Sequence, residues 1–170
     1  MAISKYLSII TLNVNGLDTL IKRQRVAEWI RKHDLQICSL QETHLITKDL
    51  HRLKVKSWKQ ILQANGQEKR ASVPILTSNK KDFKTKAIKR DPEGHFIILK
   101  GRIHQEDINI INIYAPNIGA PKHIRKNLED FKKDIDSNTL ILGVLNIPLS
   151  KMDRSSKQNI KKDIAALTMS

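Results

Sequence analysis

The sequence contains little of several residue types, and each shortage excludes a class of protein. A single cysteine, Cys38, excludes a disulfide framework and a cysteine-based zinc cluster. No apolar run approaches the roughly 18 residues that a membrane-spanning helix needs. The first ten residues, MAISKYLSII, are too short and too polar for a secretory signal. We therefore expect an intracellular, soluble protein with no membrane association.

Apolar and aromatic residues are also few. The nine apolar types make up 39% of the chain, with three Phe, two Trp and two Tyr. This content is low for a self-sufficient core but too high for a disordered chain. The length of 170 residues suits one domain, and no linker, repeat or low-complexity run divides it. We therefore interpret residues 1–170 as a single domain.

Acidic residues are scarce relative to basic ones, and the formal net charge is +14. The excess runs along the whole chain: basic and acidic residues number 13 and 6 in residues 1–70, 13 and 9 in 71–136, and 5 and 2 in 137–170. Spread positive charge favours polyanions, because binding releases condensed counterions. Nucleic acid is the leading partner, ahead of the ribosome and acidic membranes. The alternative is that the lysine-rich faces are merely solvated.

Short β-like runs alternate with helical stretches. The predicted strands lie at 7–12, 35–40, 58–63, 71–77, 83–89, 95–100, 107–113 and 138–145. A helix is predicted over 20–32 from its apolar spacing, and another opens at Pro121. Weaker helical patterns occupy 46–54 and 157–168. The first two strands and the helix between them form a β-α-β unit. The whole pattern predicts an α/β sandwich with mixed sheets rather than a doubly wound parallel sheet.

Two turn-forming features fall within this pattern. Asn65-Gly66 predicts a hairpin-type turn after the third strand. Pro74 lies inside the fourth predicted strand, where it would remove a ladder hydrogen bond unless that strand were at a sheet edge.

Polar side chains follow several of the predicted strands: Asn13, Asn15, Glu42, His44, Tyr114, Asn117 and Asn146. In α/β sheets, binding sites form beyond the carboxyl ends of strands. The Glu42 carboxylate suits Mg²⁺, which takes one or two protein carboxylates and keeps water, and Asn13 can add an amide oxygen. Tyr114 and Asn117 can donate hydrogen bonds to phosphate oxygens.

Each of these residues also has an ordinary structural explanation. An isolated Glu or Asn after a strand is most often a turn or cap residue. The Tyr114 ring can simply pack, and His44 is expected to face solvent. Cys38 lies in an apolar run and is interpreted as a core residue rather than a nucleophile. Phosphate-loop, dinucleotide, zinc-protease and nucleophile-elbow motifs are absent, so these residues alone do not name a reaction.

Four motifs in order make the sequence recognisable: TLNVNG (11–16), QETH (41–44), NIYAPN (112–117) and LGVLN (142–146). Together they resemble the endonuclease/exonuclease/phosphatase superfamily. Stretches such as LNVNGLDTLIKRQRVAEWI and KAIKRDPEGHFIILKG resemble one branch nearly continuously. That branch is the N-terminal endonuclease domain of the second open reading frame protein of mammalian long interspersed (non-LTR) retrotransposons. The resemblance covers essentially the whole chain.

The resemblance implies a fold and an activity. The fold is a four-layered α/β sandwich of deoxyribonuclease I-like type. The activity is hydrolysis of a DNA phosphodiester with Mg²⁺ or Mn²⁺. The nick primes reverse transcription by an RNA-directed DNA polymerase further along the full-length protein. The implied partners are DNA and the RNA of a retrotransposon particle, in nucleus and cytoplasm, and a monomer is expected.

The resemblance also implies site residues. Glu42 matches the metal-binding Glu, and Asn13 matches its helper at the metal. The expected substrate contacts are Asn13, Asn15, Tyr114 and Asn117. Tyr114 and Asn117 match residues at the scissile phosphate and act in catalysis with Asn146, which positions the phosphate or the attacking water.

Two departures from the family pattern predict an impaired or inactive enzyme. Val144 stands where the family has its acid/base Asp, and losing such a group typically costs a factor of roughly 10²–10⁴. The family domain also continues past the position of Ser170, where a Ser-Asp-His motif supplies a histidine. We therefore expect a C-terminally incomplete domain of marginal stability. The alternatives are a non-catalytic basic nucleic-acid-binding fragment and a retrotransposon relic without selected function.

Overall fold

The computed structural model describes residues 7–45, 47–62, 73–79, 82–115 and 120–144. Its elements, in chain order, are β1 (Ile9–Asn13), α1 (Leu20–Lys32), β2 (Ile37–Gln41), η1 (Thr47–Arg52), β3 (Trp58–Leu62), β4 (Ile75–Ser78), β5 (Phe83–Arg90), β6 (Phe96–Ile103), β7 (Glu106–Tyr114), α2 (Ala120–Phe131), η2 (Lys132–Asp134) and β8 (Thr139–Val144). They fall into two compact units, and all eight strands belong to the larger one, Met1–Tyr114 with Ile135–Val144. In the smaller unit, Ile124 and Leu128 of α2 pack on Ala115.

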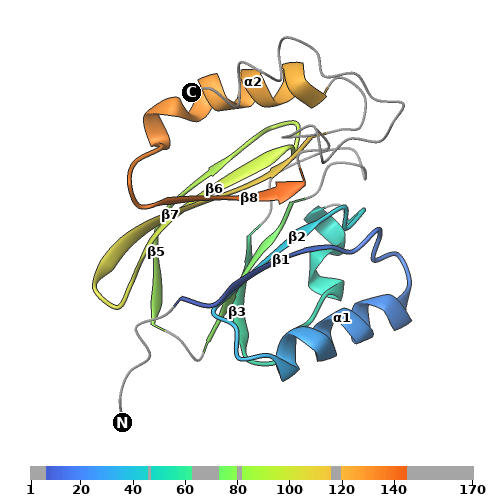
Figure 1. The fold of residues 1–170 in the computed structure, drawn as a ribbon. Helices are drawn as coiled ribbons and strands as arrows, with labels where there is room; N and C mark the ends of the chain where they lie inside the picture. The colour runs from blue at the N-terminus through green and yellow to red at the C-terminus, as the bar shows by residue number, and fades with distance from the viewer. Residues whose placement is uncertain (1–6, 46, 63–72, 80–81, 116–119, 145–170) are drawn as a thin grey trace, which may run out of the picture. The chain divides into compact units, whose positions relative to one another are not determined.

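The larger unit contains two mixed sheets of four strands (Figure 1). The first has the order β1-β2-β4-β3, with β1 and β2 parallel and the other neighbours antiparallel. The second has the order β5-β6-β7-β8, with β7 and β8 parallel and the other neighbours antiparallel. The predicted mixture of parallel and antiparallel pairing is therefore confirmed.

The two sheets pack face to face through one apolar cluster. Ile37 and Ile75 contribute from the first sheet, and Ile97, Leu99 and Ile110 contribute from the second. Because side chains alternate along a strand, residues an even number of positions away on β2 and β7 face the same interlayer. Gln41, four residues after Ile37, and Asn112, two residues after Ile110, are such residues, and both are buried.

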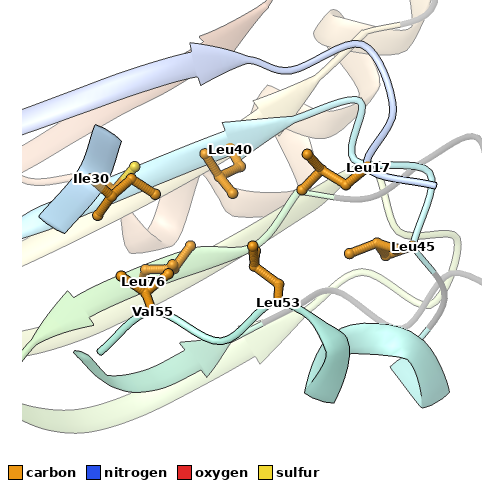
Figure 2. Close-up of a cluster of buried hydrophobic side chains, with 8 residues drawn as sticks. Leu17, Ile30, Leu40, Leu45, Leu53, Val55 and Leu76 are labelled. Atoms are coloured by element: carbon orange, nitrogen blue, oxygen red, sulfur yellow. The ribbon is translucent and has the colours of Figure 1, made fainter. Parts of the chain in front are cut away.

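Helix α1 covers the other face of the first sheet, as the β-α-β prediction requires (Figure 1). The Thr19 side chain caps it by accepting a hydrogen bond from the Lys22 amide. Figure 2 shows the cluster beneath the helix, in which Ile30 meets Leu40 of β2, Leu76 of β4 and Leu53 from the loop after η1. Among the described residues, no helix has the length and apolarity that a membrane crossing requires.

The difficulty posed by Pro74 is resolved by where β4 begins. The strand starts at Ile75, so Pro74 precedes the ladder and needs no edge position. Indeed β4 lies between β2 and β3 inside its sheet. The predicted Asn65-Gly66 turn and the weak helix over 157–168 lie outside the described residues.

We expect Cys38 to resist thiol reagents until the protein unfolds. The residue is fully buried in the cluster beneath α1, and burial raises the pKa of its thiol from 9.0 to about 12. At about pH 8 the Cys38 side chain of the folded protein is therefore almost entirely in the thiol form, whereas the thiolate is the reactive form. An aromatic disulfide reagent added with and without urea measures this. Equal reaction rates in the two conditions would show that Cys38 is accessible in the native state.

Candidate active site

Parallel pairing of β1 and β2 brings Asn13 and Glu42 side by side. Asn13 lies opposite Gln41 in the register, and Glu42 is the next residue along the chain after Gln41. The Gly16 amide donates a 2.6 Å hydrogen bond to the Glu42 carbonyl, so the two polar loops remain paired beyond the strand ends. Two motifs that are far apart in sequence thus form one edge of a site.

The backbone of these loops is constrained. Asn15, Glu42 and His44 all have positive φ values, of 45°, 53° and 56°. Glutamate rarely adopts this conformation, which costs of order 1–3 kcal/mol for a non-glycine residue and clusters at functional sites. The Asn13 side-chain oxygen also accepts a 3.0 Å hydrogen bond from the Asn15 amide. Asn13 therefore has the turn role that was the alternative explanation for an Asn after a strand. Its side-chain oxygen still has a second lone pair that can bind a ligand.

Tyr114 brings the second sheet to the same place. It ends β7, where its amide donates a 2.8 Å hydrogen bond to the His95 carbonyl and its backbone pairs with Val144 of β8. The pKa of its phenol is raised, first by burial and second by the negative charge of Glu42. Glu42 and Tyr114, from different sheets, therefore lie within electrostatic reach of each other.

A buried pair of amide side chains joins the sheets directly below these residues. The Gln41 side-chain amide donates a 2.8 Å hydrogen bond to the Asn112 side-chain oxygen. Asn112 in turn donates to the carbonyls of Leu40 and Pro74, at 3.2 and 3.3 Å. Gln41 has two further side-chain partners, Thr11 and Ser39. Because Gln41 precedes Glu42 and Asn112 lies two residues before Tyr114, this hydrogen bond joins the two sheets close to both site residues.

Sequence reasoning assigned no role to Gln41, Asn112 or His95. For Asn112, the sequence does contain a signal of its burial. It is a polar residue two positions after Ile110 on the same strand, so it faces the same apolar layer. His95 lies beside Tyr114, with its ring Nδ1 3.2 Å from an Asp91 carboxylate oxygen. The spacing of four residues around the Pro-Glu-Gly turn is the only sequence trace of this contact.

The structure brings together four of the predicted site residues, Asn13, Asn15, Glu42 and Tyr114, and pairs the Val144 backbone with that of Tyr114. Asn117 and Asn146 lie outside the described residues. His44 is half-buried, and its Nδ1 is 4.0 Å from the Asp18 carboxylate. Within the described ranges, three or more His, Cys, Asp or Glu side chains nowhere gather as a metal cluster.

Two mixed sheets packed face to face, with polar residues where β1, β2 and β7 end, define an α/β sandwich of deoxyribonuclease I-like type. The sequence profile of the Endonuclease/Exonuclease/phosphatase family matches residues 10–164, and the chain belongs to that family. The predicted fold class and superfamily are confirmed.

Known proteins agree with this assignment. The chain is 28% identical over 155 residues to the Transposon TX1 uncharacterized 149 kDa protein of Xenopus laevis, covering 88% of this chain and 12% of that protein. An AP endonuclease from Archaeoglobus fulgidus superposes with a TM-score of 0.67 at 17% identity, covering 96% of this chain and 69% of that one. D. rerio TDP2, solved as a complex with single strand DNA product, gives 0.63 at 19% identity, covering 84% and 61%. The chain therefore spans a small part of the transposon protein and about three fifths of TDP2.

Proposed function

We propose that this chain is a retrotransposon endonuclease domain of the mammalian long interspersed type. Its reaction is metal-dependent hydrolysis of a DNA phosphodiester, and it acts as a monomer. The observation that carries the proposal is that Glu42 and Tyr114, at the ends of strands from two different sheets, lie within electrostatic reach of each other. The similarity to a transposon protein and the single-stranded DNA product in the TDP2 complex support the biological setting and the substrate.

The proposed retrotransposon protein type also implies partners and a location in the cell. The nick would prime an RNA-directed DNA polymerase in the full-length protein, within a particle that also holds RNA. Such a protein works in both nucleus and cytoplasm.

The chemistry of the donor set fits Mg²⁺, with Mn²⁺ as the substitute. Glu42 offers one carboxylate, and the neighbouring Asn13 offers an amide oxygen. Mg²⁺ is typically bound by one or two protein carboxylates and keeps several waters, so a larger cluster of acidic ligands is not required. When bound, the ion would stabilise negative charge on the phosphate.

The remaining side chains would hold the phosphate. A tyrosine phenol is protonated near neutral pH, and burial together with Glu42 raises the pKa of Tyr114 further, so the group can donate a hydrogen bond to a phosphate oxygen. Asn15 and Asn117 are proposed as further substrate contacts, and Asn146 is proposed to position the phosphate or the attacking water.

We further propose that this copy is impaired. Val144 follows Gly143 at the position opposite Tyr114, where the family motif carries its acid/base aspartate. An isopropyl side chain neither accepts a proton nor orients water. The loss of such a group lowers the rate by roughly 10²–10⁴.

The chain is therefore expected to nick supercoiled plasmid in Mg²⁺ no faster than its Glu42→Ala variant. The residual site lacks a proton acceptor at position 144, so removing the metal ligand takes away little further activity. Gel conversion of supercoiled to open circular DNA measures both rates. Nicking by the unmodified chain clearly above Glu42→Ala would contradict the inactivity proposal and support an active site built on Glu42.

A second candidate function is nucleic-acid binding without catalysis. The net charge of +14 favours it. It differs from the first in needing neither Glu42 nor a metal ion.

A further inference from the structure

A basic groove lies between α1 and the segment that follows η1. Its volume is about 440 Å³. The residues that line it are Leu20, Arg23, Gln24, Ala27, Glu28 and Arg31 of α1, with Arg52 at the end of η1 and Lys54 and Lys56 just after it. Five of these carry positive charge, and Glu28 is the one acid among the described lining residues.

Four of the five cations have no acidic partner among the described residues, and only Arg52 has an ion pair. Arg23 donates to the Leu17 and Asp18 carbonyls at 2.7 and 2.8 Å, and Arg52 lies 3.4 Å from the Asp49 carboxylate. Arg31, Lys54 and Lys56 have no ion pair with any part of the chain that the structure describes. Concentrated charge of one sign without internal partners is the electrostatic footprint of a polyanion-binding surface.

The fold holds these lysines in place on one wall. Leu53 and Val55 are buried in the cluster beneath α1, so Lys54 and Lys56 alternate with them and are exposed to the groove. A smaller hollow shares Arg31 and Lys56 with the groove and extends it past the end of α1. Helix α1 has 13 residues and a length of about 20 Å, so the groove suits an extended ligand rather than a compact one.

The groove begins at the loop that leads to the candidate active site. Arg23 lines the groove and also donates to the Leu17 and Asp18 carbonyls, two and three residues beyond Asn15. A ligand lying along α1 would therefore reach the site loop. We propose that this groove binds the phosphate backbone of nucleic acid that extends from the site. The proposal deepens the nucleic-acid partner proposed above but needs neither Glu42 nor a metal.

The test compares two triple variants that remove the same charge. The groove variant is Arg31→Gln with Lys54→Gln and Lys56→Gln, and the matched control is Lys126→Gln with Lys132→Gln and Lys133→Gln, all exposed in the smaller unit. Binding of a labelled oligonucleotide is measured by anisotropy at several salt concentrations, without divalent metal. Each phosphate contact on duplex DNA contributes about 0.9 to the steepness of log K against log salt. If each of the three cations contacts a phosphate, the groove variant therefore reduces that steepness by about 3. The control leaves most of the slope intact.

Equal losses in the two variants would overturn the proposal, because they would show that only overall charge matters. Duplex DNA, single-stranded DNA and single-stranded RNA of one sequence form the arms of the test, and the arm with the largest groove-dependent slope identifies the ligand. If no arm depends on the groove, the proposal fails. Because the binding assay contains no divalent metal, a negative nicking assay leaves its result unaffected.

A second measurement uses the unmodified chain and does not depend on the variants folding. A bound oligonucleotide should protect Lys54 and Lys56, but not Lys132, from an amine-acylating reagent. Lysine modification is read by peptide mass spectrometry. Equal labelling of Lys54 and Lys56 with and without the oligonucleotide would overturn the assignment.

Discussion

Replacing Gly143 by alanine is expected to lower the free energy of unfolding by roughly 2–5 kcal/mol. Gly143 has a φ of 138°, which side-chain-bearing residues rarely adopt. A Cβ at this position would overlap the carbonyl oxygen of Ile113, its partner in the parallel β7–β8 pair. That atom belongs to the backbone of an interior strand, so it cannot rotate away as a side chain would. Urea unfolding followed by circular dichroism measures the loss.

The same substitution should disturb the candidate site, because the next pair in the register is Tyr114 with Val144. Amide hydrogen exchange along the end of β7 should therefore quicken in Gly143→Ala. Ser137→Ala, at an exposed position just before β8, serves as the control and is expected to cost less than about 0.5 kcal/mol. A Gly143→Ala variant as stable as Ser137→Ala would show that the strand end shifts freely.

Most of the secondary structure could be predicted because it depends on local periodicity. The apolar spacing over 20–32 gave α1 its observed bounds, since Ile30 and its neighbours must face one side of a helix. The ends of strands are harder to predict where a single residue determines them. Of the predicted strand over 71–77, the structure describes 73–77, where β4 begins at Ile75 and continues to Ser78, since Pro74 stays out of the ladder and instead accepts hydrogen bonds through its carbonyl.

The candidate site was only partly predictable. The positions of Asn13, Glu42 and Tyr114 after strands follow from sequence, because each strand and its end leave a local pattern. Their convergence does not, since it depends on which strands pair and how two sheets are stacked. The Gln41–Asn112 contact joins residues 71 positions apart, and no periodicity within either strand encodes it. The family resemblance suggested what each site residue does, whereas the distances between these residues depend on how the two sheets pack.

The Gln41–Asn112 pair leads to the other large expected effect. Asn112→Leu should destabilise the protein by roughly 2–4 kcal/mol, because a buried hydrogen-bonding group without its partner costs about 1–3 kcal/mol. The substitution leaves the side-chain nitrogen of Gln41 with Ser39 as its remaining acceptor, and it removes the donor to the Leu40 and Pro74 carbonyls. Thermal and urea unfolding measure the change. Asn109→Leu is the matched control on the same strand, because the Asn109 amide bonds the exposed Asp136 and is only half-buried.

A double-mutant cycle separates the pair from its surroundings. Gln41→Leu and Asn112→Leu together should cost less than the sum of the two single changes, by about 1–2 kcal/mol, because neither amide is then left without the other. A second measurement tests the positioning of the site rather than its stability. If the pair holds Glu42 near Tyr114, the pKa of the Tyr114 phenol should fall toward its ordinary value of 10.0 in folded Asn112→Leu. Additive stability losses with an unchanged Tyr114 titration would mean that the two amides act independently, and that the spacing between Glu42 and Tyr114 is set by the apolar packing of the sheets alone.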